Sequence, residues 1–446
     1  HLILNASAVV QVVMALLAAL HPGVPARQMQ LNDGGIWVTN QNLRLVGHLN
    51  YPSRTLDGAV RTTTPTFDVS QAGDTVFVED AVNARTSSVD TAAFTIDQGA
   101  EHGKSVVFSH AANTTAFADA QAGRVWVMDA SQASGFSTTA EPTLEDVPGA
   151  RAIVGTDGVA NIVLPSGAVK RVEQREVKDV GTIQGLKDLA SGDITMVGDT
   201  LVVLDRASSM VRTVHGSTPV DSPQRMVLQQ PGPAAETVLV AGEDSYLAAP
   251  LTGGDVAPTP VQGKGKPARP VLLQGCSYLA WAGTGNYVRT CGKPADSKAE
   301  SVEALRGSTE LAFRTNRDVI VLNDTASGRL VMVNQNMQVV DNWEQINTQN
   351  KETQDDTLSD TETTDQMSVD KNKSDTKPDA LDDEYGVRPG KSFTLPVLEN
   401  DVDPDGDLLL ASVKTQPKGA TVSRARGGEA LSIDVPADAP PSMSFQ

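Results

Sequence analysis

A chain of 446 residues is too long for one ordinary domain, and its length predicts about two to four folded units. Its 36 Lys and Arg residues against 55 Asp and Glu residues give a net charge of -19, so its surface repels nucleic acids and anionic headgroups and we expect no nucleic-acid partner. Val, Thr, Gly, Asp and Ser are abundant while aromatic residues make up 4%, a composition that favours short strands and turns.

Residues 1–22 form an apolar N-terminal segment with no charged side chain from Leu2 to Leu20. As a helix its first twenty residues would be roughly 28 Å long at about 1.5 Å per residue, close to the thickness of a bilayer core. We expect a signal peptide or a single-pass signal anchor that ends at His21-Pro-Gly, with a buried helix as the alternative. No small-x-small cleavage pattern precedes His21. A retained membrane anchor is therefore favoured, with the bulk of the chain extracytoplasmic.

An internal repeat follows, in which a Gly or Asp turn leads into a short apolar strand that often ends in Asp or Asn. Its copies are DGGIWVTN (33–40), AGDTVFVED (72–80), AGRVWVMDA (122–130), TDGVANIVL (156–164), VGDTLVVLD (197–205), AGEDSYLAA (241–249), QGCSYLAWA (274–282) and TNRDVIVLND (315–324). The copies are spaced by about 40 residues, which is the length of a four-stranded propeller blade.

This repeat predicts an all-β chain with a β-propeller over 30–346. Radial stacking protects the edges of such short sheets. Seven blades are our first choice, with the first and last motifs sharing one blade, and eight blades are the alternative. A succession of β-sandwiches is disfavoured because its repeat would be longer than the observed one.

Two residue types within the repeats have a structural interpretation. Trp37, Trp126, Trp281 and Trp343 lie in or just after strand motifs, so we expect core anchors and not sugar-stacking platforms. The Asp or Asn residues that end the motifs should bond turn backbone, although a ring of them around the axis could instead bind cations. These residues are Asn40, Asp80, Asp129, Asp205 and Asp324.

The chain has two cysteines, Cys276 and Cys291, in the stretch GCSYLAWAGTGNYVRTCG. A strand, a Gly-Thr-Gly-Asn turn and a second strand form a hairpin that would bring the two sulfurs together. In an exported chain this pattern predicts one disulfide, and two reduced thiols are the alternative. No histidine or third cysteine lies near, which disfavours a metal site.

Residues 347–382 are acidic and almost free of apolar side chains. Such a segment cannot bury enough surface to offset the entropy of ordering the chain, so we expect a disordered linker. Its many Thr, Ser and Asp residues leave a docking or modification segment as the alternative.

Residues 383–446 contain short strands divided by Pro-Gly, Pro-Asp-Gly and Gly-Gly turns. About 60 residues are few for an immunoglobulin-like (Ig-like) β-sandwich, so we expect an incomplete module that stops before its last strands.

Four aspartates alternate within this module, at Asp401, Asp403, Asp405 and Asp407. Alternating carboxylates can supply several of the six to eight oxygens that calcium needs. An EF-hand is excluded because its twelfth position is Ser412 and not Glu. A cadherin-like calcium site completed by Asp382, Asp383 or Glu384 remains open, as does an acidic Pro-Asp-Gly hairpin without metal.

The stretch ALDDEYGVRPGKSFTLPVLENDVDPDGDLLLASV (380–413) carries a Val-Arg-Pro-Gly turn, a Leu-Pro-Val-Leu strand and an Asp-rich loop. It resembles the tandem Ig-like, cadherin-like modules of bacterial surface proteins. Together with LNDGGIWVTNQNLRLVGHLN (31–50), it is similar to the N-terminal part of large membrane-anchored actinobacterial proteins with Ig-like and fibronectin type III modules. The sequence ends at Gln446, within the first module, and contains no fibronectin module. The resemblance implies an architecture and a location, and no particular chemistry.

Catalytic motifs are scarce. Six scattered histidines form no metal-binding pattern, and nucleophile elbows, phosphate loops and sialidase boxes are missing from the sequence. We therefore expect a non-catalytic, membrane-anchored scaffold or adhesion protein of the bacterial envelope, with envelope proteins or polysaccharide as partners. The alternative is a secreted propeller hydrolase or lyase acting on cell-wall polysaccharide. Three or more carboxylates, His or Arg converging in the central funnel would contradict the first function, and a funnel of unpaired Thr, Ser and Val would contradict the second.

Overall fold

The computed structural model divides the chain into two compact units, His1–Ser359 and Asp360–Gln446. In the first unit it describes residues 34–173 and 176–346. In the second it describes residues 377, 380–395, 397–398, 401, 409, 411–425 and 430–446.

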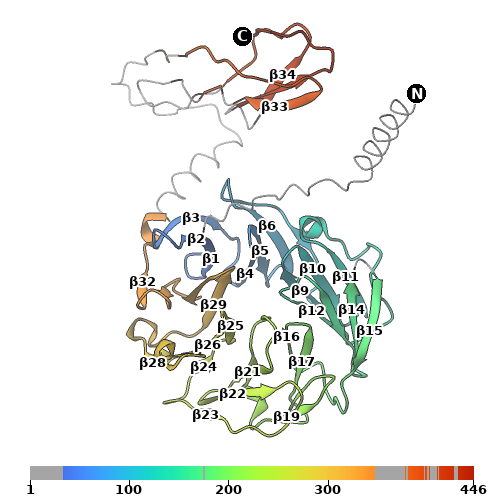
Figure 1. Ribbon diagram of the computed structural model, residues 1–446, viewed down its shortest axis with the longest axis vertical. Helices are drawn as coiled ribbons and strands as arrows, with labels where there is room; N and C mark the ends of the chain where they lie inside the picture. The colour runs from blue at the N-terminus through green and yellow to red at the C-terminus, as the bar shows by residue number, and fades with distance from the viewer. Residues whose placement is uncertain are drawn as a thin grey trace, which may run out of the picture. The chain divides into compact units, whose positions relative to one another are not determined.

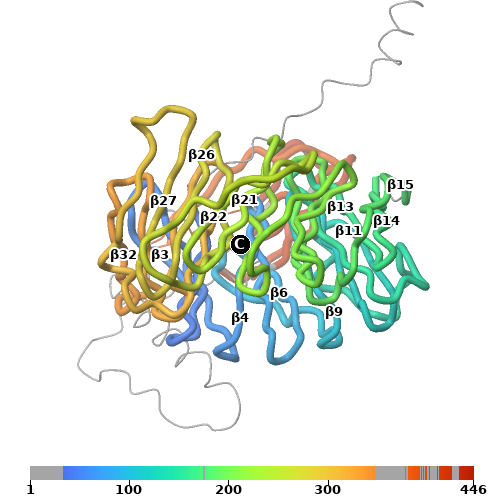
Figure 2. The backbone as a smooth tube through the Cα atoms, turned by 90° about the horizontal axis from the view of Figure 1, so that it is seen from below, coloured from blue at the N-terminus to red at the C-terminus, as the bar shows by residue number. Residues whose placement is uncertain are grey.

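The first unit is a ring of eight antiparallel sheets around a central axis (Figure 1). Figure 2 shows the same ring from its side. Blade 1 contains β1 (Gly35–Asn40), β2 (Leu45–Asn50) and β3 (Thr55–Arg61), and blade 2 contains β4 (Phe67–Ala72), β5 (Thr75–Asp80), β6 (Arg85–Asp90), β7 (Thr95–Ile96) and β8 (Ala100–Glu101). Blade 3 contains β9 (Val106–Ala111), β10 (Thr114–Asp119) and β11 (Arg124–Asp129). Blade 4 contains β12 (Arg151–Val154), β13 (Ala160–Val163), β14 (Ala168–Glu173) and β15 (Glu176–Thr182).

Blade 5 contains β16 (Asp193–Val197), β17 (Thr200–Asp205), β18 (Met210–Arg212) and β19 (Ser217–Pro219), and blade 6 contains β20 (Val227–Leu228), β21 (Thr237–Ala241), β22 (Ser245–Pro250) and β23 (Thr259–Pro260). Blade 7 contains β24 (Lys266–Pro267), β25 (Val271–Leu273), β26 (Cys276–Ala282), β27 (Asn286–Cys291) and β28 (Lys298–Ser301). Blade 8 contains β29 (Leu311–Asn316), β30 (Val319–Asp324), β31 (Leu330–Met332) and β32 (Gln338–Val340). Short 3-10 helices lie at η1 (Ala130–Gly135), η2 (Pro223–Arg225), η3 (Pro294–Asp296) and η4 (Glu303–Leu305), and residues 343–346 form a helical turn. The all-β propeller predicted from the repeat is confirmed.

The blade count is eight, so the prediction of seven blades with a shared closing blade is wrong and the alternative of eight is right. The first motif does not join the last sheet, because β1 pairs with β2 and β3 in a sheet of its own. The last motif, which forms β30, likewise has β29, β31 and β32 as its own partners.

Each blade buries both of its faces, which explains why its strands are apolar on both sides. A separate hydrophobic cluster fills every one of the eight junctions between neighbouring blades. At the junction of blades 2 and 3, for example, Phe77 packs with Phe108 and Phe117. The four tryptophans are at most 2% exposed, so the prediction that they anchor the core is confirmed.

The terminal Asp and Asn residues of the motifs mostly act as predicted. Asp80 Oδ1 accepts hydrogen bonds from the backbone N–H groups of Val82 and Asn83, and Asp324 Oδ1 accepts from those of Ala326 and Ser327.

Asn40 and Asp205 bond the turns that follow them in the same way. Asp129 differs, because it ends the third strand of its blade and accepts a bond from the side chain of Asn113. Short polar side chains thus close several of the turns between strands.

Blade 1 lacks an innermost strand in the described part of the chain. The repeat motif forms the second strand of blades 2, 4, 5, 7 and 8, namely β5, β13, β17, β26 and β30. In blade 1 the same motif forms β1, which is the first strand of its sheet. The inner edge of β1 therefore faces the ring axis without a neighbouring strand in this part of the chain.

The predicted disulfide is present. Cys276 and Cys291 are directly opposite each other on β26 and β27, with an S–S distance of 2.03 Å. The hairpin between them belongs to blade 7.

The second unit contains a three-stranded sheet of β33 (Lys391–Leu395), β35 (Ala430–Val435) and β34 (Thr421–Ala425), in that order. Its core is formed by Leu395, Val422, Leu431, Ile433 and Val435. This sheet is compatible with part of an Ig-like module, but the described residues do not form a complete two-sheet sandwich.

Two predicted segments fall largely outside the described residues. The predicted N-terminal helix at 1–22 lies wholly outside them, and only 377 and 380–382 of the predicted linker at 347–382 are described. Among the residues that are described, no helix has the length and hydropathy needed to cross a membrane.

Candidate binding site in the central channel

A cavity of about 1800 Å³ lies at the centre of the ring and is lined by residues from all eight blades. Its wall includes the ionisable residues Asp68, Glu79, His110, Asp193, Arg269 and Arg314. More than three carboxylate, histidine and arginine side chains thus converge in the funnel. This is the condition that we expected to speak against a purely structural propeller. Their hydrogen bonds show which of them are committed to joining blades and which are not.

The inner edge of β1 is bonded by side-chain amides in place of a strand. Asn323 on β30 accepts a hydrogen bond from the Thr39 N–H (2.9 Å) and donates one to the Thr39 carbonyl oxygen (3.0 Å). Gln71 on β4 accepts from the Trp37 N–H (2.9 Å), and Asn316 on β29 donates to the Gly35 carbonyl oxygen (2.8 Å). Amides from blades 2 and 8 thus satisfy the exposed ladder of blade 1.

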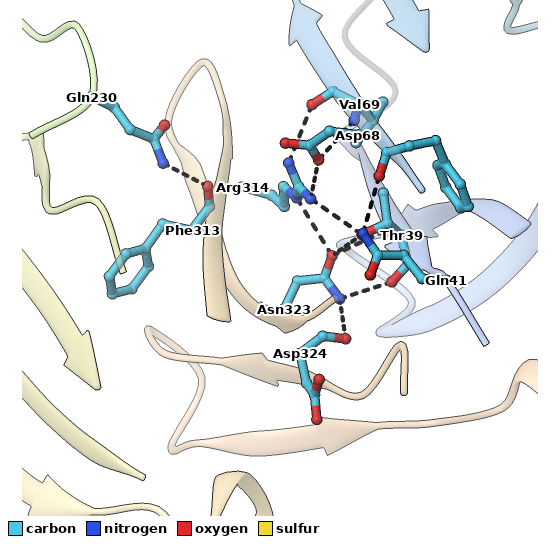
Figure 3. A network of polar contacts seen from close by, with 10 residues as sticks. Thr39, Gln41, Asp68, Val69, Gln230, Phe313, Arg314, Asn323 and Asp324 are labelled. Atoms are coloured by element: carbon cyan, nitrogen blue, oxygen red, sulfur yellow. Dashed lines mark hydrogen bonds and ion pairs between the residues drawn. The ribbon is translucent and has the colours of Figure 1, made fainter. Parts of the chain in front are cut away.

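Arg314 connects blades 8, 1 and 2 within the same network (Figure 3). Its guanidinium forms an ion pair with Asp68 Oδ1 (Nη2–Oδ1, 2.5 Å) and donates to the Val69 carbonyl oxygen (3.2 Å). It also donates to Thr39 Oγ1 (3.2 Å) and to Asn323 Oδ1 (3.4 Å). Arg314 reaches blade 2 because the described part of blade 1 places no strand between β29 and β4.

Glu79 lies directly opposite Asp68 across β5 and β4. Both carboxyl groups line the cavity, and no hydrogen bond to the Glu79 carboxyl is formed within the described residues. Burial raises the pKa of Glu79 to about 8, the Asp68 charge adds to this effect, and Arg314 opposes it. The pair therefore holds a proton near neutral pH.

Ser70 and His110 lie beside this pair at the junction of blades 2 and 3. Ser70 Oγ and His110 Nδ1 are 3.2 Å apart, and the His110 ring packs edge-on against Phe77. His110 Nε2 is buried and has no hydrogen-bond partner among the described residues. Burial lowers the pKa of His110 to about 4, so its imidazole is neutral at pH 7. No described carboxylate bonds the His110 ring, so the described residues do not complete a Ser-His-Asp triad here.

A second charged cluster joins blades 5, 6 and 7. Asp193 Oδ1 pairs with Arg269 Nη1 (2.9 Å), and Asp193 Oδ2 accepts from the Leu228 N–H (2.9 Å). Arg269 also donates to the carbonyl oxygens of Ile194 and Gln229 (3.2 Å each). These charged groups bond other blades and leave little capacity for a ligand.

Sequence reasoning missed Glu79, Asn323 and Arg314. Glu79 and Asn323 occupy the same place in the repeat, directly before the turn Asp, where the copy in β17 has Leu204. A polar residue at an otherwise apolar repeat position could have singled out both. Arg314 lies outside the motif core and carries no comparable pattern.

Of the predicted calcium ligands, the structure describes only Asp401, whose Oδ1 accepts a hydrogen bond from the Leu381 N–H (2.8 Å). Asp403, Asp405 and Asp407 lie outside the described residues. The described residues contain no cluster of three or more His, Cys, Asp or Glu side chains that could hold a metal ion, including around the propeller axis.

A scan against protein-family models found no match, and no curated protein matches the sequence. Similar solved structures include BamB from Moraxella catarrhalis (13% identity, TM-score 0.45, 67% of this chain and 93% of that chain). Apo AztD from Citrobacter koseri (12%, 0.44, 69% and 94%) and the computationally designed Ika8 protein (8%, 0.49, 67% and 93%) are also similar. Likenesses of this size carry no argument about function.

Proposed function

We propose that the chain is a non-catalytic, membrane-anchored interaction or scaffold protein of the bacterial envelope, with the propeller outside the cytoplasm. This proposal rests on the bonding of the charged side chains in the channel, most of which join neighbouring blades. Arg314, Asp193 and Arg269 each bond groups on other blades, so they stabilise the ring as a platform. Such a platform would offer its rims and loops to envelope proteins or polysaccharide.

The disulfide supports the proposed compartment. Disulfides form and persist mainly in oxidising environments such as the cell surface and the periplasm. Cys276 and Cys291 are the only cysteines of the chain, and they pair with each other.

The second candidate function is a propeller hydrolase or lyase acting on cell-wall polysaccharide. One specific observation favours it, namely the facing carboxyl groups of Asp68 and Glu79 at the cavity wall. Because Glu79 keeps its proton near neutral pH, it has the protonation state that a general acid requires.

Capture of partners by the immobilised full chain from envelope extracts tests the first proposal. We expect envelope proteins or polysaccharide to be retained equally by the wild type and by Glu79→Gln, because the rims do not contain this residue. Release of soluble sugar fragments from cell-wall polysaccharide by the wild type, and not by Glu79→Gln, would instead establish the enzyme.

Thiol labelling in intact cells tests the compartment. Cysteines of an exported chain should react with a maleimide only after reduction. Labelling of Cys276 and Cys291 without a reductant would contradict the extracytoplasmic location.

A further inference from the structure

Arg151, the first residue of β12, is a cation of the channel wall without a carboxylate partner. Three other cations of the wall form ion pairs, namely Arg314 with Asp68 (2.5 Å), Arg269 with Asp193 (2.9 Å) and Lys266 with Glu310 (3.0 Å). Arg151 lines the same cavity and forms no ion pair within the described residues. Because a guanidinium group stays charged in proteins, this side chain can attract an anion from the channel.

The guanidinium group of Arg151 has one free edge. Its Nη1 atom donates to the Gly192 carbonyl oxygen (2.6 Å), whereas Nε and Nη2 form no hydrogen bond in the part of the chain that the structure describes. Neither of these two atoms is both buried and unbonded, so both are open to the cavity that Arg151 lines. Two parallel N–H groups along such an edge match the two oxygens of a carboxylate.

The charges around Arg151 are mainly positive. Arg269 pairs with Asp193, and Arg206 Nε donates to the Ser191 carbonyl oxygen (2.9 Å), so both lie beside the segment that Arg151 bonds. Burial lowers the pKa of Arg151, the Asp193 charge opposes this effect, and Arg269 and Arg206 add to it. Three guanidinium groups thus gather around one carboxylate, which favours a second negative charge at this place.

Small apolar side chains line the cavity beside Arg151. Its chain neighbours Ala150 and Ala152 both line it, and so does the exposed Ala190 in the segment before β16. Val107 on β9 lines the cavity as well and is 54% exposed. Together these side chains offer an apolar surface to a ligand that reaches Arg151.

Val107 faces blade 4, to which Arg151 belongs. Ser109, two residues further along β9, accepts a hydrogen bond at Oγ from the Val154 N–H of β12 (3.0 Å). Side chains two residues apart lie on the same face of a strand, so Val107 also faces β12. The apolar surface of Val107 and the guanidinium of Arg151 therefore lie on either side of β12, because Arg151 extends to Gly192 of blade 5.

We propose that the channel wall at blade 4 binds the carboxylate group of an organic acid, with Arg151 as its counter-ion and the Val107 surface beside its carbon chain. A carboxylate has one charge and two oxygens, which suit the one free edge of Arg151, whereas a phosphate dianion would bring a second negative charge close to Asp193. The apolar wall favours an organic acid over a hydrated inorganic anion. This site goes beyond the proposed envelope role and does not depend on it.

The experiment is calorimetric titration of the full chain with hexanoate at pH 7. Hexanamide, acetate and inorganic phosphate serve as comparison probes. Hexanamide keeps the carbon chain without the charge, and acetate keeps the carboxylate with a single methyl group. We expect hexanoate to bind at least tenfold more tightly than each comparison probe, because it alone combines the charge with an apolar chain.

Arg151→Gln should weaken hexanoate binding at least tenfold, and its amide can still donate to the Gly192 carbonyl oxygen. Arg317→Gln is the matched control, because Arg317 lines the same cavity in the turn after β29 and should leave the affinity unchanged. Val107→Ser changes an exposed side chain and tests the site independently of the Arg151 contact with blade 5. It should reduce the preference for hexanoate over acetate and leave acetate binding unchanged.

Four results would each overturn the site. They are equal affinity of Arg151→Gln and wild type, an equal loss in Arg317→Gln and Arg151→Gln, a comparison probe that binds as tightly as hexanoate, and no binding of hexanoate. Hexanoate binding without envelope capture would contradict only the proposed envelope function. Envelope capture without hexanoate binding would overturn only the carboxylate site.

Discussion

Asn323 bonds Thr39 as a neighbouring strand would, by accepting from its N–H at 2.9 Å and donating to its carbonyl oxygen at 3.0 Å. Both residues are buried, and they come from opposite ends of the propeller sequence. Within residues 34–346, the ring is thus closed at this seam by side chains.

Asn323→Leu should destabilise the propeller strongly, because it leaves the buried N–H and carbonyl oxygen of Thr39 without these bonds. We expect a loss of about 2 to 4 kcal/mol in the free energy of unfolding, measured by denaturant titration. Asn334→Leu provides an exposed control, because Asn334 bonds the side chains of Tyr278 and Arg289 and no backbone group of β1. An equal loss in both variants would contradict the special role of Asn323.

Gly47→Ala should also weaken the seam. A Cβ atom at residue 47 would lie 2.5 Å from the indole ring of Trp343, which is buried between blades 8 and 1. We expect a loss of about 1 to 3 kcal/mol, as is typical of overpacking. Gly135→Ala is the matched control, since a Cβ atom there meets no neighbour within 4 Å. Thermal melting of both variants checks the prediction, which requires only Gly47→Ala to melt at a lower temperature.

Glu79→Gln should flatten the dependence of stability on pH. The Glu79 carboxyl group ionises near pH 4.5 in the unfolded chain but keeps its proton up to about pH 8 in the folded one. Unfolding therefore releases a proton between these values, so the contribution of Glu79 to stability falls as the pH rises from 4.5 to 8 and is constant above.

The loss from this one group is on the order of 3 to 5 kcal/mol, because each pKa unit corresponds to about 1.4 kcal/mol. Urea unfolding at pH 5, 7 and 9 gives the measurement. Glu79→Gln should be more stable than wild type at pH 9 and show little difference from it at pH 5. Parallel pH profiles of the two proteins would show that Glu79 titrates normally.

Reduction of the Cys276–Cys291 disulfide should lower stability by at most about 3 kcal/mol, the value for a closed loop of 15 residues. The double variant Cys276→Ser with Cys291→Ser should show the same loss and become insensitive to reductant. Because β26 and β27 also pair through their backbones, we expect the fold to persist. Loss of the circular dichroism spectrum of the folded chain on reduction would contradict this expectation.

The calcium prediction for the aspartate loop can be tested on the full chain. If the loop binds calcium, a chelator should lower the melting temperature of the second unit, and Asp405→Asn should abolish this effect. Asp438→Asn, an exposed aspartate elsewhere in the same unit, is the control. An unchanged melting profile with and without chelator would contradict calcium binding and favour an acidic Pro-Asp-Gly hairpin without metal.

The propeller could be predicted because its signal is repeated. Each copy joins a turn residue to an apolar strand at a spacing of about 40 residues, and one error in one copy does not hide the pattern. The disulfide and the buried tryptophans could be predicted because each depends on the strand motif in which it lies. Cys276 and Cys291 flank a single hairpin, so their pairing required no knowledge of distant contacts.

The seam and the channel could not be predicted in this way, because they depend on residues far apart in sequence. Arg314 and Asp68 are brought together only when the ring closes, and no local pattern marks them as partners. The blade count was uncertain for a related reason. The motif of β1 matches the second strand of other blades, and the sequence does not reveal that β1 heads a sheet of its own.

The amide-bonded seam also means that the ring does not depend on the chain entering and leaving it between blades 8 and 1. Each sheet is formed by consecutive segments, so a circularly permuted chain that starts at Phe67 and ends at Arg61, with a new link between blades 8 and 1, keeps the pairing of all eight sheets. The covalent break would then lie between blades 1 and 2, and the seam would be spanned by backbone. The junction between blades 8 and 1 is thus one of several places at which this ring could be opened.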